Sequence, residues 1–191
     1  MSTPVLHVLA GPNGSGKSTF VREVLGPVTH LPFINADEIA EQRWPGHAEE
    51  HAYDASAAAA AARDQAIADR RSVITETVFS HPSKVDLIKQ GLDAGYLVEL
   101  HVMLVPEELA VARVAYRVRL GGHTVPEDKV RRRYRRLWAL VAQARQIVDR
   151  ATFYDNTSSK PFRTVAVYER GRPVGTPTWP TWASAEITAD A

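Results

Sequence analysis

The residues with the clearest chemistry lie near the start of the chain, in one uninterrupted segment. They are Gly11, Pro12, Asn13, Gly14, Ser15, Gly16, Lys17, Ser18 and Thr19, and the first eight match the P-loop pattern G-x-x-x-x-G-K-[ST]. Glycines let the backbone wrap around phosphates with its amide groups pointing inward, and a helix that begins here adds partial positive charge. In such a loop Lys17 contacts the β- and γ-phosphates, and the Ser18 hydroxyl ligates Mg²⁺.

Two carboxylates follow later apolar runs of the sequence. Asp37 comes after residues 31–35, where a kinase needs a carboxylate that orients an acceptor hydroxyl and takes its proton; a helix N-cap is the alternative role. Glu76 lies in a β-rich run and is too polar for plain core. We expect Glu76, with Thr77, to contact substrate or to hold Mg²⁺ through water, the alternative being an exposed residue paired with an arginine. Asn35 is either a turn residue or a substrate contact.

Basic residues gather between positions 113 and 136. They are Arg113, Arg117, Arg119, Lys129, Arg131, Arg132, Arg133, Arg135 and Arg136, opposed there only by Glu127 and Asp128. Two arginine sets on either side of the loop 121–126 suit a lid that closes over phosphates and stabilises transition-state charge. We expect phosphate contacts from at least one of Arg113 and Arg117 and from one of Arg132 and Arg133, with a solvated basic face accounting for others.

These residues need a scaffold of alternating strands and helices. The expected strands cover residues 5–10, 31–35, 72–79, 96–105, 152–155 and 163–168, and the expected helices cover 19–25, 37–42, 49–70, 82–94, 106–120 and 126–150. Gly26-Pro27 is expected to stop the first helix. The alternation predicts an α/β fold, a P-loop NTPase whose parallel sheet carries helices on both faces. The P-loop, Asp37 and Glu76 then share the edge where the strands end, which is where such sheets bind ligands.

Length and composition fit one domain with a tail. The chain has 191 residues, of which 45% are hydrophobic and 24% charged, so we expect a kinase domain over residues 1–170, with its lid at about 113–136, and a C-terminal tail over 171–191. Trp179 and Trp182 favour docking of that tail. The absence of cysteine, of a signal peptide and of any membrane-length apolar run predicts a cytoplasmic protein with no membrane contact. A net charge of +1 argues against nucleic acid as a partner.

Four segments, in this order, resemble the zeta toxin family of P-loop kinases, and most closely its compact single-domain relatives. They are Gly11–Thr19, Asn35–Asp37, Glu76–Ser80, and Gly121–Pro126 with Arg131–Tyr134, and the likeness runs from about Val5 to Ser159. It implies a nucleoside-monophosphate-kinase-like sheet and a kinase that uses ATP or GTP with Mg²⁺. It also implies a small-molecule acceptor, for zeta toxins a sugar hydroxyl of UDP-N-acetylglucosamine, and an antitoxin protein as partner.

The resemblance assigns roles to individual residues. It makes Asp37 the catalytic base, Lys17 and Ser18 the phosphate and Mg²⁺ residues, and Glu76 with Thr77 a substrate-side motif. The lid arginines are represented by Arg113, Arg117, Arg132 and Arg133, and Asn156 is placed near the adenine. The leading hypothesis is therefore a phosphotransferase with an alcohol group as acceptor. A polynucleotide-end kinase, motivated by the arginines, and a non-enzymatic ATP-binding regulator remain as alternatives.

Overall fold

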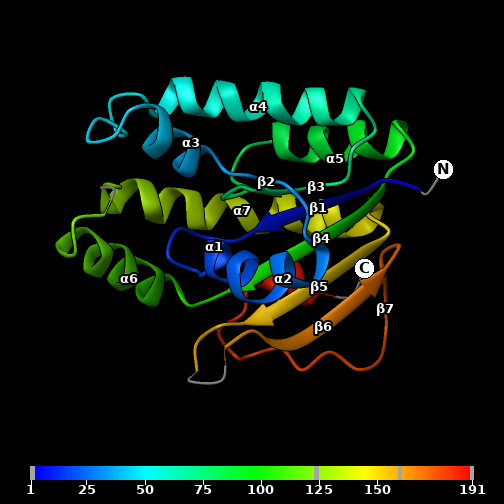
Figure 1. Ribbon diagram of the computed structural model, residues 1–191. Coiled ribbons are helices and arrows are strands. Elements are labelled where there is room, and N and C mark those ends of the chain that lie inside the picture. The colour runs from blue at the N-terminus through cyan, green and yellow to red at the C-terminus, as the bar shows by residue number, and fades with distance from the viewer. Residues whose placement is uncertain (1–2, 123–124, 159–160, 190–191) are drawn as a thin grey trace.

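The computed structural model describes residues 3–122, 125–158 and 161–189, and in that part the chain forms one seven-stranded sheet (Figure 1). Its strands lie in the order β2 (Phe33–Ile34), β3 (Val73–Glu76), β1 (Val5–Ala10), β4 (Leu97–Leu104), β5 (Arg150–Asp155), β6 (Arg163–Glu169) and β7 (Arg172–Pro173). The first five are parallel, whereas β6 and β7 are antiparallel to their neighbours. The expected α/β fold is confirmed, with an antiparallel edge that the sequence did not predict.

Helices cover the two faces of the sheet unequally. One face carries α4 (Ala52–Ala68), α5 (Ser83–Asp93), α7 (Glu127–Ile147) and the short α8 (Ala185–Thr188), and the other carries α1 (Lys17–Phe20), the π-helical turn η1 (Val21–Leu25) and α2 (Gly26–Thr29) (Figure 1). The larger core fills the first face. The second face has a small core around Leu9, Phe20 and Met103, so part of that face lies outside helical cover.

Two further helices lie at the edge where the parallel strands end. These are α3 (Ala36–Arg43) and α6 (Glu107–Arg119), and both border the left-hand side of Figure 1. The strand-to-helix turns before α1, α3 and α6 therefore meet at one edge, as the sequence predicted. This edge carries the site described below.

Three expected boundaries were wrong. The first helix does not stop at Gly26-Pro27: in η1 the Gly26 N–H donates to the Val21 carbonyl, which leaves Pro27 in the first turn of α2, where no N–H is required. Strand β3 ends at Glu76 rather than at Phe79, because Phe79 takes a left-handed backbone (φ 64°) while its side chain is fully buried. The last long helix ends at Ile147, so Arg150 begins β5 instead.

The C-terminal segment packs onto the body, as its tryptophans indicated. The Trp179 ring lies 5.0 Å from that of Phe153, and the Thr178 N–H donates to the Val165 carbonyl at 2.7 Å. Further along, Ile187 is fully buried, and the buried Arg145 guanidinium donates to its carbonyl at 2.8 Å. No helix in the described ranges is long and apolar enough to cross a membrane.

Candidate active site

The P-loop connects β1 to α1 and presents its backbone to a cleft. Gly14 and Gly16 adopt positive φ angles of 76° and 91°, a conformation that glycine reaches without strain. A Cβ atom at Gly16 would lie 2.4 Å from Nδ2 of Asn156, which itself donates to the Ser15 carbonyl at 2.9 Å. Asn156 therefore braces the loop from behind, and the position of Gly16 excludes a side chain.

Lys17 is a buried cation at the base of this loop. Its ammonium donates to the Gly11 and Pro12 carbonyls at 3.0 and 2.9 Å, and it lies 3.6 Å from Oε1 of Glu76. Burial lowers the pKa of Lys17, and the carboxylates of Glu76 and Asp37 oppose that shift. A buried ammonium whose charge is disfavoured gains most from a strongly anionic ligand such as a triphosphate.

Glu76, at the end of β3, links the P-loop to Asn35 at the end of β2. Its Oε2 accepts from the Ser18 hydroxyl at 2.6 Å and from the Asn35 amide at 2.9 Å. Asn35 is also the N-cap of α3, because its Oδ1 accepts from the Asp37 N–H at 2.8 Å. The capping role that was the alternative for Asp37 thus belongs to Asn35, and the Asp37 carboxylate is left exposed in the first turn of α3.

A cleft of about 1040 Å³ brings most of the expected site residues together. Its lining includes Asn13, Gly14, Gly16, Lys17, Ser18, Thr19, Asn35, Asp37, Glu76, Thr77, Arg113, Arg117, Arg133 and Asn156. Three expected residues, Gly11, Pro12 and Ser15, are absent from the lining and hold Lys17 and Asn156 through their carbonyls. One cleft thus borders the P-loop, both strand-end carboxylates and three of the four expected arginines.

The arginines of α6 and α7 divide into two groups. Arg133 faces the cleft, where burial lowers its pKa and the Asp37 charge opposes the shift, and Arg113 donates to the Asn156 carbonyl at 3.0 Å. Arg132 does not line the cleft: it is exposed and pairs with Asp128, one turn earlier. Of this pair of arginines, only Arg133 lines the cleft. The expected loop residues His123 and Thr124 lie outside the described residues.

Two cations of the cleft were missed from the sequence. Arg63 of α4 and Lys84 of α5 both line it and are half-buried. Burial lowers the pKa of each, and the charge of Arg63 lowers that of Lys84 further. In the described part of the chain neither side chain forms a hydrogen bond or an ion pair, although the nearby Asp64 charge opposes the lowering of the Arg63 pKa. Spacing gave no signal for them: Arg63 is the one cation of α4, Lys84 shares α5 only with the exposed Lys89, and the two lie in helices far apart in the sequence.

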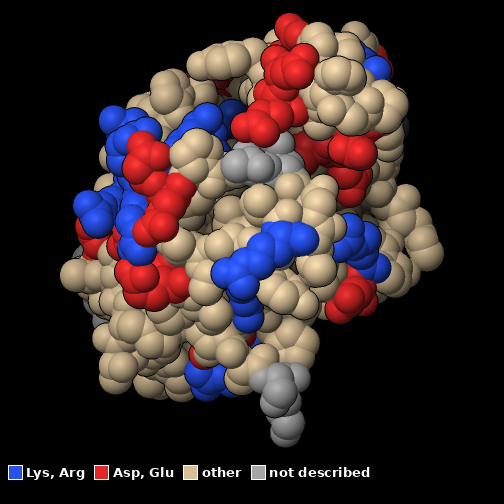
Figure 2. All heavy atoms as spheres, turned by 90° about the vertical axis from the view of Figure 1, so that its left-hand side faces the viewer, with Lys and Arg blue, Asp and Glu red and all other residues tan. Residues whose placement is uncertain are grey.

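The surface around the cleft is mixed in charge. Figure 2 faces the edge where the parallel strands end and shows acidic side chains interspersed among the basic ones. Part of this mixing comes from ion pairs such as Arg131 with Glu108 and Glu127, and Arg135 with Glu107. This face therefore lacks the continuous basic surface that favours a polynucleotide.

Comparisons with known proteins agree with this geometry. The family described as Zeta toxin matches residues 1–169. An uncharacterized protein of Haemophilus influenzae is 32% identical over 125 residues, which are 65% of this chain and 88% of that protein. Among solved structures, the PezAT toxin–antitoxin system of Streptococcus pneumoniae matches with a TM-score of 0.60 at 14% identity, covering 81% of this chain and 68% of that one. A gluconokinase from Sinorhizobium meliloti matches with a TM-score of 0.54 at 20% identity, covering 83% and 86%.

Proposed function

The chain belongs to the zeta toxin family, and from that premise we propose that it is an ATP-dependent kinase that transfers the γ-phosphate to a hydroxyl group of a small anionic molecule. Family membership and the P-loop kinase fold support the phosphotransferase activity. The identity of the acceptor, the choice of ATP over GTP and the roles of individual residues are parts of the proposal.

One observation carries the proposal: Asp37 lines the same cleft as Lys17 and the glycine loop. With a nucleotide in the loop, Lys17 binds the terminal phosphates, and the exposed Asp37 carboxylate accepts the proton of the attacking hydroxyl. Arg133, whose pKa is influenced by the Asp37 charge, stabilises negative charge on the transferred group. These roles require no rearrangement of the sheet, because all three side chains already face one cavity.

Magnesium is the metal that this chemistry implies, and the donors present suit it. The Ser18 hydroxyl and the Glu76 carboxylate are 2.6 Å apart, and both are the oxygen ligands that Mg²⁺ prefers. Ser18 would hold the ion directly, and Glu76 would hold it directly or through water. When bound, Mg²⁺ neutralises charge on the β- and γ-phosphates.

The acceptor is proposed to be anionic because, within the described ranges, neither Arg63 nor Lys84 forms an ion pair with a carboxylate. Two like charges near one another in a partly desolvated wall are costly unless an anion lies between or beside them. A phosphate or pyrophosphate group supplies that charge, with arginine offering two parallel donors. UDP-N-acetylglucosamine, the acceptor implied by the family resemblance, carries such a pyrophosphate.

The test is a phosphotransfer assay with ATP and Mg²⁺ on matched acceptors. We expect transfer to UDP-N-acetylglucosamine or another phosphorylated sugar, little transfer to neutral N-acetylglucosamine, and a loss of about 10²–10⁴-fold in kcat for Asp37→Asn. Arg63→Gln and Lys84→Gln should raise KM for the charged acceptor more than KM for ATP. Full activity of Asp37→Asn would overturn the mechanism, and equal use of neutral and charged sugars would overturn the anionic acceptor. Repeating the assay with GTP decides the donor.

An antitoxin partner is also proposed, on narrower grounds. The streptococcal structure with this fold comes from a toxin–antitoxin system, and the chain shares its family. Expression of the chain alone in bacteria checks this: growth arrest that disappears with Asp37→Asn supports a toxin, and unaffected growth contradicts it.

A further inference from the structure

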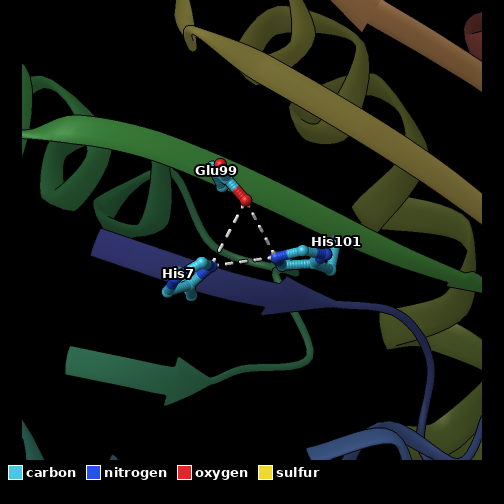
Figure 3. A group of neighbouring side chains, drawn as sticks. All are labelled: His7, Glu99 and His101. Carbon is cyan, nitrogen blue, oxygen red and sulfur yellow. Dashed lines mark hydrogen bonds and ion pairs between the residues drawn. The ribbon is translucent and has the colours of Figure 1, made fainter. Parts of the chain in front are cut away.

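Three polar side chains converge on the thinly covered face of the sheet, apart from the nucleotide cleft (Figure 3). His7 comes from β1, and Glu99 and His101 come from β4. The parallel register places His7 directly beside Glu99, and His101 follows two residues later on the same face. None of the three lines the cleft. Strand pairing alone therefore assembles the group.

The distances among the three suit one metal ion. Nδ1 of His7 lies 3.1 Å from Nε2 of His101 and 3.5 Å from Oε2 of Glu99, and the remaining edge, His101 to Glu99, is 3.8 Å. Zinc–ligand bonds of about 2.0–2.2 Å imply about 3.3–3.6 Å between neighbouring ligand atoms of a tetrahedron. The three edges lie around that value, so one ion can reach all three atoms without movement of the strands.

The surroundings orient these ligands. Nδ1 of His101 lies 3.4 Å from the Tyr154 hydroxyl, which leaves Nε2 directed toward His7; metal-binding histidines commonly use one nitrogen for the metal and the other for such a partner. The His101 ring also packs against Phe20, with centroids 5.7 Å apart. Both imidazoles are almost fully buried, whereas the Glu99 side chain is 37% exposed. The group is held rigidly on its inner side and is open to solvent at Glu99.

We propose that His7, Glu99 and His101 bind a divalent transition-metal ion of the zinc type, with a fourth position open to water. Two imidazoles and one carboxylate are donors that such ions favour over Mg²⁺ or Ca²⁺. The ion joins the adjacent strands β1 and β4 on the face where helices give little cover. Because it lies outside the nucleotide cleft, its effect is on the stability of the sheet, and its binding is independent of nucleotide.

Calorimetric titration of the metal-free full chain with zinc chloride, without nucleotide, tests the site. We expect one ion per chain, a rise in Tm of about 5–10 °C at a hundredfold excess over Kd, and affinity at least 100-fold weaker in His7→Gln and His101→Gln. His51→Gln is the matched control, because His51 forms an exposed pair with Asp54 and should bind zinc like the wild type. Equal affinity in all four proteins, or no binding, would overturn the proposal and leave a hydrogen-bonded histidine pair.

Cobalt(II) provides a readout that misfolding cannot imitate. Bound by two imidazoles and one carboxylate in a tetrahedral site, it should give the intense visible absorption of four-coordinate cobalt. Glu99→Gln, at a partly exposed position, should weaken that absorption while circular dichroism stays unchanged. The weak spectrum of six-coordinate, water-ligated cobalt in the wild type would contradict the site.

Discussion

The basic side chains of this protein fall into two regions that differ in their partners rather than in their charge. Along α6 and α7, Arg131 contacts three carboxylates and Arg132 pairs with Asp128. On α4 and α5, Arg63 and Lys84 line the cleft and are half-buried, and in the described part of the chain no carboxylate forms an ion pair with either. In the region denser in arginine, Arg131, Arg132 and Arg135 are thus paired with carboxylates of the protein itself, whereas Arg113, Arg117 and Arg133 line the cleft.

This difference predicts which cations contribute most to the free energy of binding an anion. An exposed ion pair is worth about 0–1 kcal/mol and can be exchanged for water at little cost. A partly desolvated cation without a partner costs stability until an anion arrives. Binding energy for phosphate is therefore expected from the unpartnered cations of the cleft, and little is expected from the paired arginines of α7.

The largest effect is expected for Lys17→Met, which removes a third kind of cation: Lys17 is buried in the cleft and is paired with Glu76 at 3.6 Å. We expect kcat to fall by at least about 10³-fold, because Lys17 is the P-loop cation and its charge cannot be supplied by a neighbour. Single-turnover formation of ADP measures the effect. Lys89→Met, on an exposed position of α5, is the control and should keep wild-type activity. Retention of more than a tenth of the activity by Lys17→Met would contradict its proposed role on the terminal phosphates.

A smaller effect separates two consecutive arginines of one helix. Arg133→Gln should lower kcat/KM by about 10–100-fold, or about 1.4–2.7 kcal/mol, because Arg133 faces the cleft. Arg132→Gln should change it by less than about twofold, since its guanidinium pairs with Asp128 at the surface. Steady-state kinetics on both variants measure the difference. Equal losses, or a larger loss for Arg132→Gln, would show that closure of α7 brings the paired arginines to phosphate.

The site residues that could be predicted from the sequence are those whose position follows from one local element. The P-loop, Asp37 and Glu76 each follow an apolar run, and parallel strands place such residues at one edge, so the structure brings them into one cleft as predicted. The sheet was predicted for the same reason. The exception is its antiparallel edge at β6 and β7: residues 156–162, between β5 and β6, are too few for the crossover that parallel strands need, and this signal in the sequence was missed.

What could not be predicted depends on contacts between distant segments. Arg63 and Lys84 meet only because α4 and α5 pack side by side, and their sequence neighbours give no motif. His7 joins the 99–101 segment through strand register, and a shift of one residue would turn its side chain to the other face. Arg132 and Arg133 look equivalent in sequence, and the helix rotation that separates them is set by which side of α7 packs on the sheet.

The smallest expected effect is on stability, and here Lys17 and Arg131 should differ in sign. Burial sets the pKa of Lys17 below its usual 10.5. Below the folded pKa the lysine is charged in both states, and its burial lowers the free energy of unfolding in full. As pH rises from the folded pKa to 10.5, the unfolded chain holds a proton that the folded protein has lost, and this penalty disappears.

Lys17→Met should therefore raise the free energy of unfolding near neutral pH by about 1 kcal/mol, with a gain that shrinks above the folded pKa. The Arg131 pKa is raised by its carboxylate partners, so Arg131→Met should lower stability slightly from neutral pH up to 10.5, and this loss should disappear in acid as Glu108, whose pKa Arg131 lowers, becomes protonated. Urea unfolding followed by circular dichroism at several pH values measures both, and a Lys17→Met protein less stable than the wild type at neutral pH would show that the buried ammonium stabilises the empty loop.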